Sequence, residues 1–304
     1  MSTYSLKPKI IGSGLSGLVG QRVVELLSDR FTFVDFSLDG GLDILDYTAL
    51  RSAYERHLDA VGVLHLAAFT DTHAAWGQRG DRSGLCYRLN VEGTRHMFDL
   101  AQRHKQHFVY LSTDFVFDGT KTTAYTEEDA PHPIEWYGET KYLGEKLVIE
   151  SASAATVARI TYPYRTRFDP KADIVRKVIA KLSAGEMVKM FSDQICTHTF
   201  IDDIAAALGY LLEHRNAGIY HLVGSSSQSP YEMSRKIAEV FGFDAGLVQP
   251  SSLDDFVRSL PSTSRPWQKS LVTSNRKITG LGLTFRTLGE GLLEVKKQRA
   301  GARC

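Results

Sequence analysis

A tyrosine and a lysine one helical turn apart carry the chemistry that this sequence suggests. Tyr137 and Lys141 fall at the start of a stretch with helical periodicity, residues 137–149, so both side chains project from one face. A free tyrosine has a pKa of about 10, and a neighbouring ammonium group favours the phenolate and lowers that pKa. A tyrosine tuned in this way can transfer a proton to a carbonyl oxygen near neutral pH.

Two hydroxyl residues end a strand that is predicted just before this helix. The run from His107 to Leu111 is apolar and typical of a strand, and Ser112 and Thr113 follow it directly. Either hydroxyl can hold the same carbonyl oxygen. The alternative is a surface Tyr and Lys that share this spacing by coincidence, because Tyr-x-x-x-Lys alone is a weak signal. The Ser-Thr pair before it and a glycine-rich start to the chain favour the catalytic interpretation.

The glycine-rich start follows the first predicted strand, which begins at Lys9. Gly14, Gly17 and Gly20 come next, and residues 21–27 have the pattern of a helix. Strand, glycine turn and helix is the context of a dinucleotide-binding loop. Gly14 permits the tight turn, Gly17 lets the backbone approach a pyrophosphate, and Gly20 allows the helix to pack closely.

An acidic residue ends the second predicted strand, residues 31–36. Asp35 lies about twenty residues past the glycines, where a carboxylate can bind ribose hydroxyls. No Arg or Lys follows before Arg51, so no basic side chain is near to meet a 2′-phosphate. This pattern favours NAD, with NADP as the alternative. A solvated Asp at a strand end is the structural alternative, and Asp43 is a candidate acceptor for the adenine amino group.

The elements that position these residues alternate between strand and helix from residue 9 to residue 160. This alternation predicts an α/β fold with a doubly wound parallel sheet, a Rossmann fold. After about residue 165 the segments are shorter and more mixed. We therefore expect a dinucleotide-binding domain at 1–165 and a smaller substrate-binding lobe at 166–304, interleaved with the first. Within the first domain we expect a loop at 72–84 and a continuous helix at 86–104.

The composition excludes several classes of protein. The 304 residues include 36 basic and 35 acidic ones, a net charge of +1 without a block of one sign. Nucleic acid and anionic membranes are therefore not expected as partners. No apolar stretch is long enough to span a bilayer, and we expect a soluble, cytoplasmic protein. Three widely spaced cysteines, Cys86, Cys196 and Cys304, indicate a reducing compartment, and no metal site is predicted.

Several motifs together resemble a known family. The chain contains Gly14-x-x-Gly17-x-x-Gly20, Leu66-Ala-Ala-Phe-Thr-Asp71, Leu111-Ser-Thr-Asp-Phe-Val-Phe-Asp-Gly119 and Tyr137-Gly-x-x-Lys141. With these motifs it resembles the extended short-chain dehydrogenase/reductases, and within them the dTDP-4-dehydrorhamnose reductase family. The similarity spans nearly the whole chain.

The resemblance implies NAD(P)H-dependent reduction of a 4-keto group on a nucleotide-linked deoxysugar. Tyr137 would be the proton donor, and Lys141 would lower its pKa and hold the nicotinamide ribose. Thr113, with Ser112, would orient the sugar carbonyl. The cofactor-binding residues would be Gly14, Leu15, Ser16, Gly17, Gly20, Asp35, Asp43, Ile44, Leu66, Ala67, Ala68, Tyr137 and Lys141. The substrate-binding residues would be Asp114, Gln194, Thr197 and Arg265.

Besides a loop from Asp71 to Asn90 that is longer than usual, the chain departs from the family pattern in two places that leave the sugar and its nucleotide open. Tyr162-Pro163-Tyr164-Arg165 replaces the usual run after the fifth strand, and His198-Thr199 replaces a Pro-Thr pair. Two other functions also stay open: 4-epimerisation of a sugar nucleotide with tightly held NAD, and a non-catalytic regulatory subunit of S-adenosylmethionine synthetase. The intact Thr113, Tyr137 and Lys141 weigh against the regulatory subunit. A homodimer is one assembly that the sequence allows.

Overall fold

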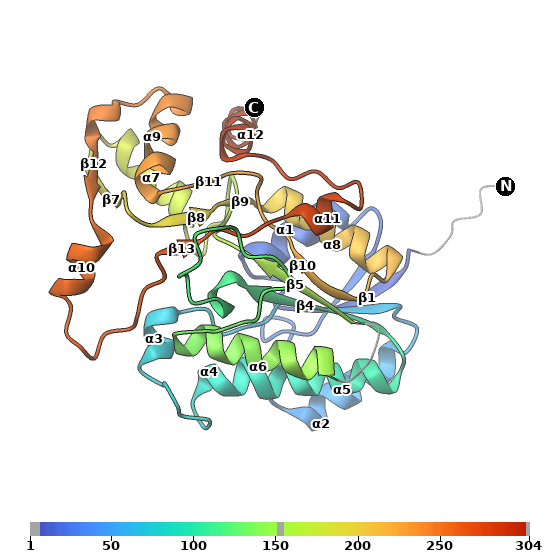
Figure 1. Ribbon diagram of the computed structural model, residues 1–304. Coiled ribbons are helices and arrows are strands. Elements are labelled where there is room, and N and C mark those ends of the chain that lie inside the picture. Colours follow the sequence, from blue (N-terminus) through green and yellow to red (C-terminus); the bar gives the residue numbers. More distant parts are fainter. Residues whose placement is uncertain (1–6, 151–154, 302–304) are drawn as a thin grey trace. The chain divides into compact units, whose positions relative to one another are not determined.

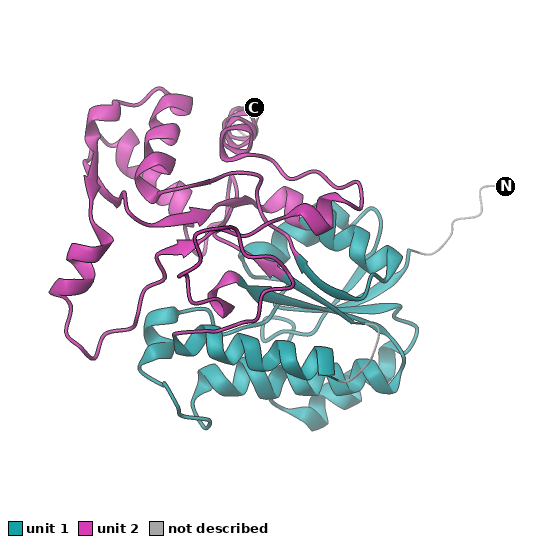
Figure 2. Cartoon of the chain, viewed as in Figure 1, with its two compact units in different colours: residues 1–113, 135–158, 205–220 teal, residues 114–134, 159–204, 221–304 magenta. Residues whose placement is uncertain are grey.

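The computed structural model describes residues 7–150 and 155–301, and it divides into two compact units (Figure 2). Unit 1 contains the chain up to residue 113 together with 135–158 and 205–220. Unit 2 contains 114–134, 159–204 and the chain from residue 221 onward. The chain therefore passes repeatedly between the units. Cys86 and Cys196 are buried and free, while Cys304 lies outside the described residues.

A six-stranded sheet forms the centre of unit 1, in the order β10-β5-β4-β3-β1-β2 (Figure 1). Its strands are β1 (Lys9–Ser13), β2 (Thr32–Asp35), β3 (Gly62–His65), β4 (His107–Thr113), β5 (Ala155–Ile160) and β10 (Gly218–His221). β1 pairs in parallel with β2 and with β3, and β3 pairs in parallel with β4. This arrangement confirms the predicted doubly wound α/β fold. It also brings the carboxyl ends of β1, β3 and β4 to one edge, because Ser13 faces His65 and His65 faces Tyr110.

Helices cover both faces of this sheet (Figure 1). One face is covered by α2 (Tyr47–Tyr54), α5 (Thr94–Arg103) and α6 (Trp136–Glu150). The other is covered by α1 (Leu18–Leu27) and α8 (Ile201–His214), and Arg30, which follows α1, forms an ion pair with Glu213 of α8 at 2.6 Å. Leu50, Val63 and Phe108 are in the apolar core on the first face. Each is at most 1% exposed, and burying a side chain of this size contributes about 1.5–3 kcal/mol.

Two of the expected segments in unit 1 differ from the structure. The predicted loop at 72–84 begins with a short helix, α3 (Thr72–Trp76), because the Asp71 carboxylate accepts the backbone N–H groups of His73 and Ala74. The predicted continuous helix at 86–104 is divided into α4 (Leu85–Tyr87), a π-helical stretch η2 (Arg88–Gly93) and α5. Apolar periodicity does not reveal one extra residue in a turn, so the sequence pattern gave no sign of η2.

Unit 2 has three small sheets, with strand orders β11-β8-β13, β12-β7 and β6-β9. Their strands are β6 (Pro163–Tyr164), β7 (Val188–Phe191), β8 (Ile195–Thr197), β9 (Thr199–Phe200), β11 (Ser227–Gln228), β12 (Val248–Ser251) and β13 (Ser270–Leu271). The α-helices of unit 2 are α7 (Ile174–Ser183), α9 (Pro230–Phe241), α10 (Leu253–Ser259), α11 (Arg276–Thr279) and α12 (Leu288–Gly301). Its 3-10 helices are η3 (Asp114–Val116) and η4 (Ala245–Leu247). Unit 1 also has a 3-10 helix, η1 (Glu55–His57). A capping box starts α9: the side chains of Ser229 and Glu232 each accept the other residue's backbone N–H.

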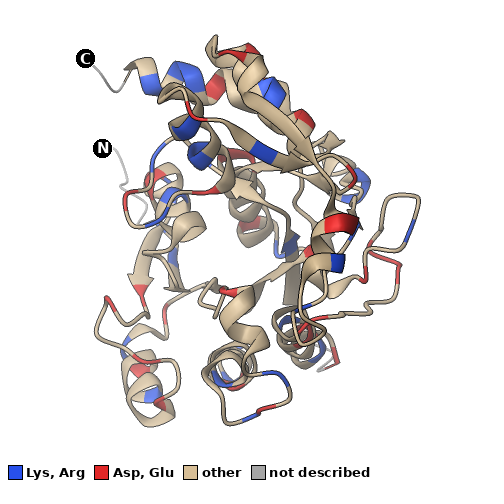
Figure 3. Cartoon of the chain, turned by 90° about the vertical axis from the view of Figure 1, so that its left-hand side faces the viewer, with Lys and Arg blue, Asp and Glu red and all other residues tan. Residues whose placement is uncertain are grey.

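Basic and acidic positions are interspersed along the ribbons in Figure 3, in line with the near-zero net charge. Within residues 7–150 and 155–301, no helix combines the length and apolar character needed to cross a membrane.

Candidate active site

The start of α6 holds Tyr137 in place through a carboxylate. Glu135 directly precedes the helix, and its side chain accepts the backbone N–H groups of Tyr137, at 3.1 Å, and of Gly138. A carboxylate satisfies donors that have no partner inside the helix and interacts favourably with the positive end of the helix dipole. The sequence interpretation missed Glu135, although an acidic residue just before the first helical residue is a recognised start signal.

Lys141, one turn further along α6, is buried against β4. It is 2% exposed, and its Nζ lies 4.1 Å from the centroid of the Tyr110 ring. The Tyr110 hydroxyl donates to the Lys141 carbonyl oxygen at 3.3 Å, which ties α6 to the strand. Burial lowers the pKa of the Lys141 ammonium to about 7, and the charges of Glu145 and Cys86 oppose this shift. The structure therefore places a titratable cation next to Tyr137 on one helix.

The carboxyl end of β4 supplies the predicted hydroxyl pair. Ser112 is 3% exposed, and its hydroxyl has no hydrogen-bond partner among the described residues. Thr113 is 6% exposed, and Asp114 follows as the first residue of η3 in unit 2. A buried hydroxyl without a partner is costly unless a ligand supplies one. The Ser112 hydroxyl is therefore suited to bond a substrate oxygen.

Asn90 joins three parts of unit 1 around this site. Its side chain forms two bonds with the backbone of Phe69, accepting the N–H at 2.8 Å and donating to the carbonyl at 3.2 Å. The same amide donates at 2.9 Å to the Thr140 hydroxyl, which donates to the Tyr137 carbonyl at 2.9 Å. η2 is thus bonded to the segment after β3 and to the first turn of α6. The Asn90 amide therefore bonds both a backbone peptide group and a side-chain hydroxyl.

His65 is a core residue at the end of β3. It is fully buried, with Nδ1 bonded to the Ser13 hydroxyl at 2.6 Å and Nε2 bonded to the Thr94 hydroxyl at 3.0 Å. Burial lowers the pKa of its imidazole to about 3, with Lys141 adding to the shift, so the ring is neutral at neutral pH. This neutral ring fixes Ser13 at the end of β1.

The glycine-rich loop is shaped to admit a dinucleotide. Gly14 has a φ of +69°, and a Cβ there would lie 2.6 Å from the backbone nitrogen of Ala67. A Cβ at Gly20 would meet the carbonyl oxygen of Gly14, so α1 starts in close contact with the loop. The Ala67 N–H also donates to the Ser13 hydroxyl at 3.4 Å. The loop and the small-residue segment after β3 therefore meet at the sheet edge where such folds hold a pyrophosphate.

The other predicted cofactor residues in unit 1 lie around this loop and the end of β2. Asp35 accepts the Ser37 hydroxyl at 2.7 Å and ends β2, whereas Asp43 is exposed and accepts the Leu45 N–H at 2.9 Å. Of the remainder, Leu15 and Ile44 are buried, Leu66, Ala67 and Ala68 are partly buried, and Ser16 is exposed. These residues fit NAD or NADP in position and chemical type, and their contacts with a cofactor stay a prediction.

The predicted substrate residues belong to unit 2. Gln194 is 6% exposed and donates to the Gln268 carbonyl at 2.9 Å, and Thr197 is fully buried with its hydroxyl 2.7 Å from that of Ser227. Both therefore have structural partners already. The guanidinium of Arg265 lies 3.8 Å from the centroid of the Trp267 ring, a cation–π arrangement, and its Nη1 donates to the Pro266 carbonyl at 3.1 Å.

The two departures from the family pattern lie together within unit 2. The rings of Tyr162 and His198 have centroids 5.4 Å apart, and Gln228 Nε2 lies 3.0 Å from His198 Nδ1. Tyr162 has a φ of +33°, a strained conformation for a residue with a side chain. Burial lowers the pKa of His198 to about 4, so this ring is neutral.

Comparisons with known proteins agree with this geometry. The family model of the RmlD substrate binding domain matches residues 8–297. A probable low-salt glycan biosynthesis reductase of Haloferax volcanii is 30% identical over 295 residues, covering 92% of this chain and 94% of that protein. The dTDP-4-dehydrorhamnose reductase of Streptomyces griseus is 30% identical over 287 residues, covering 92% of this chain and 90% of that protein.

A solved structure has the same fold. The dTDP-4-dehydrorhamnose reductase of Bacillus anthracis, crystallised with NADP, superimposes with a TM-score of 0.86 at 24% identity, covering 96% of this chain and all of that one. The resemblance seen in the sequence motifs is thereby confirmed. Since the family model spans nearly the whole sequence, the chain belongs to the RmlD substrate binding domain family.

Proposed function

We propose that this protein is an NAD(P)H-dependent oxidoreductase that reduces the 4-keto group of a nucleotide-linked deoxysugar. The observation that carries the proposal is the pairing of Tyr137 and Lys141 on α6 with the unpartnered Ser112 hydroxyl at the end of β4. All three belong to unit 1, which also contains the glycine loop. The Streptomyces griseus relative is a dTDP-4-dehydrorhamnose reductase, which makes a dTDP-4-keto-6-deoxyhexose the first substrate to test.

The residues of this site would divide the reduction between them. When bound, NAD(P)H supplies a hydride to the carbonyl carbon. The Ser112 and Thr113 hydroxyls hold the carbonyl oxygen, and Tyr137 donates its phenolic proton to that oxygen as the C=O π bond breaks. The product is a secondary alcohol, and the charged Lys141 stabilises the phenolate that Tyr137 becomes. Lys141 also hydrogen-bonds the nicotinamide ribose in this proposal.

A preference for NADH over NADPH is expected from Asp35. Its carboxylate at the end of β2 bonds ribose hydroxyls but repels a 2′-phosphate. Wild-type kcat/KM should be higher with NADH, and Asp35→Ala should narrow the difference between the two cofactors. Asp39→Ala, an exposed acid four residues on, is the matched control and should leave the ratio unchanged. Equal kcat/KM values for the two cofactors in the wild type would contradict this assignment.

The activity is expected to depend on pH through Lys141. Because burial lowers its pKa to about 7, the charged fraction of Lys141 falls as the pH rises through that value. The free protein loses the cation that stabilises the Tyr137 phenolate, so kcat/KM should decline on the alkaline side, by about tenfold per pH unit at the limit. Measuring kcat/KM from about pH 6 to about pH 9 checks this. A constant kcat/KM across that range would show that Lys141 stays charged or is not needed.

The reductase proposal is tested by mixing the protein with NADH and a panel of dTDP-, UDP- and GDP-linked 4-keto-6-deoxyhexoses. We expect stoichiometric loss of nicotinamide absorbance with at least one of them. If the absorbance stays flat while NADH binds normally, the reductase assignment is wrong. Two further measurements then separate the other functions: tightly bound NAD in the purified protein indicates an epimerase, and capture of S-adenosylmethionine synthetase indicates a regulatory subunit.

A further inference from the structure

A cavity lies within unit 2, and its lining residues include none of those assigned above to the reaction. Its volume is about 410 Å³, and its walls come from three segments within residues 123–126, 224–227 and 273–276. Most of the lining side chains are serine and threonine hydroxyls, joined by Asn275 and Arg276. A cavity of this size is in the range of small-molecule sites, and the hydroxyl-bearing residues in its lining can bond a polar ligand.

One lining residue has a buried polar atom that the protein leaves without a partner. Thr273 is 6% exposed, and its hydroxyl forms no hydrogen bond with any described residue. The backbone on both sides of it is held by Tyr125, whose N–H donates to the Val272 carbonyl and whose carbonyl accepts the Ser274 N–H, each at 2.8 Å. The backbone of Thr273 is therefore held in place and cannot shift easily to bring the hydroxyl to another partner. A buried hydroxyl of this kind indicates a ligand that supplies the missing bond.

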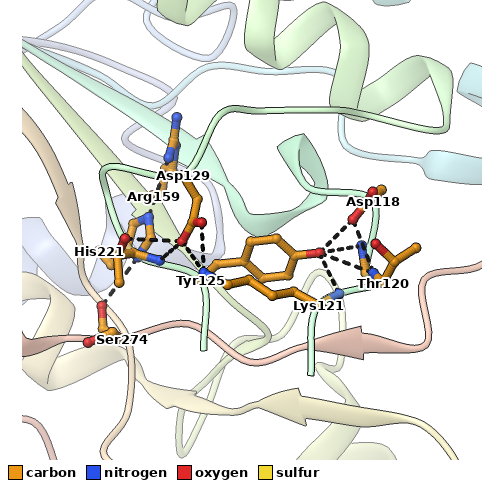
Figure 4. A network of polar contacts seen from close by, with 10 residues as sticks. Asp118, Thr120, Lys121, Tyr125, Asp129, Arg159, His221 and Ser274 are labelled. Carbon is orange, nitrogen blue, oxygen red and sulfur yellow. Dashed lines mark hydrogen bonds and ion pairs between the residues drawn. The ribbon is translucent and has the colours of Figure 1, made fainter. Parts of the chain in front are cut away.

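The wall behind Thr273 is rigid. The Tyr125 hydroxyl donates to Asp118 at 2.5 Å and accepts the backbone N–H groups of Gly119, Thr120 and Lys121 at 3.1–3.2 Å (Figure 4). Figure 4 also shows the ring of His221 bonded to the Ser274 carbonyl, at 3.2 Å. Both ends of this wall are thus fixed before any ligand arrives, which lowers the entropy cost of binding.

The cavity offers hydrogen-bond donors that the protein does not use. The Ser226 hydroxyl accepts the Leu288 N–H at 2.9 Å and the Ser274 hydroxyl accepts the Arg276 N–H at 3.3 Å, and neither donates to a described residue. Each therefore has its proton available for a ligand. Arg276 is exposed, and its guanidinium has no ion pair within the described parts of the chain. Donor hydroxyls beside a guanidinium fork suit an oxyanion.

The acidic residues near the cavity are engaged elsewhere. The Asp129 carboxylate is paired with Lys121 at 2.6 Å and accepts the N–H and hydroxyl of Thr126. Glu127 accepts the backbone N–H of His221 at 2.9 Å. Asp129 is thus paired with a cation, and neither carboxylate is among the residues that line the cavity.

We propose that this cavity binds a monosaccharide phosphate. The phosphate lies at Arg276 and the Ser274 hydroxyl, and the sugar hydroxyls bond Thr273 and Ser226. A free phosphate would fill only a small part of about 410 Å³, which is why the proposal includes the sugar. This proposal can be tested independently of the proposed reductase activity, because binding of the sugar phosphate can be measured without any turnover.

The test is isothermal titration of the full-length protein with glucose 1-phosphate, compared with glucose and with inorganic phosphate. We expect saturable binding of glucose 1-phosphate that is tighter than binding of either control. Arg276→Gln should weaken it by about tenfold or more, the loss of one charge-assisted bond. Arg258→Gln, which removes an exposed arginine from α10, is the matched control and should leave the affinity for glucose 1-phosphate unchanged.

Thr273→Val tests the buried hydroxyl. The two side chains have nearly the same shape, so we expect the variant to fold, with thermal stability equal to or above that of the wild type, while binding glucose 1-phosphate more weakly. Saturating dTDP should leave the wild-type affinity for glucose 1-phosphate unchanged, because none of the residues that line the cavity is among those proposed to bind the nucleotide sugar. The proposal is overturned if glucose 1-phosphate does not bind, if it binds no tighter than phosphate, or if dTDP displaces it and Arg276→Gln has no effect.

Discussion

Replacing Tyr137 with phenylalanine is expected to lower kcat by about 10² to 10⁴, the usual contribution of general acid catalysis. The substitution removes the phenolic proton and leaves the ring, so the first turn of α6 should stay intact. The Glu135 carboxylate bonds the backbone of residues 137 and 138, not the Tyr137 hydroxyl. Cofactor affinity should therefore change little.

Steady-state kinetics and cofactor titration of Tyr137→Phe check this prediction. Tyr142→Phe is the matched control, since it removes a hydroxyl from the same helix five residues further on. The control should keep wild-type kcat. A Tyr137→Phe variant that turns over at nearly the wild-type rate would remove Tyr137 from the mechanism.

Replacing Lys141 with methionine is expected to reduce both turnover and cofactor affinity. Methionine fills most of the buried volume beside Tyr110 but cannot stabilise a phenolate or donate to a ribose hydroxyl. Loss of a charge-assisted hydrogen bond should weaken NAD(H) binding by about tenfold or more, and kcat should fall by about 10² or more. The alkaline decline of kcat/KM should also disappear, since the titrating group is gone.

Fluorescence titration with NADH and a pH–rate profile measure these effects separately. Lys146→Met is the matched control, because Lys146 is on the same helix with a side chain that is 46% exposed. It should bind NADH and turn over like the wild type. If Lys141→Met binds NADH as the wild type does, the ribose role of Lys141 is wrong even where its kcat is low.

Local spacing made the centre of the candidate site predictable from sequence. Helical periodicity placed Tyr137 and Lys141 on one helix, and a short apolar run placed Ser112 and Thr113 at a strand end, as α6 and β4 show. These features depend on residues close together in the chain. The alternation of such strands and helices was also sufficient to predict the doubly wound sheet.

Features that depend on distant residues were not predictable in the same way. Asn90 is 21 residues from Phe69 and 50 from Thr140, and only the folded chain shows that its amide bonds both. The burial of Thr197 is set by Ser227, 30 residues away. The π-helical η2 breaks the regular helical period, so a pattern of apolar residues cannot locate it.

The division of the chain into two units has a consequence for how the substrate specificity of such a protein can evolve. The residues proposed for proton transfer belong to unit 1, and those proposed for substrate recognition belong to unit 2. Drift in segments 159–204 and 221–301 can therefore alter which sugar is accepted while α6 and its tyrosine stay unchanged. A directed-evolution library confined to those segments, which contain Tyr162 and His198, is the natural route to new substrate ranges.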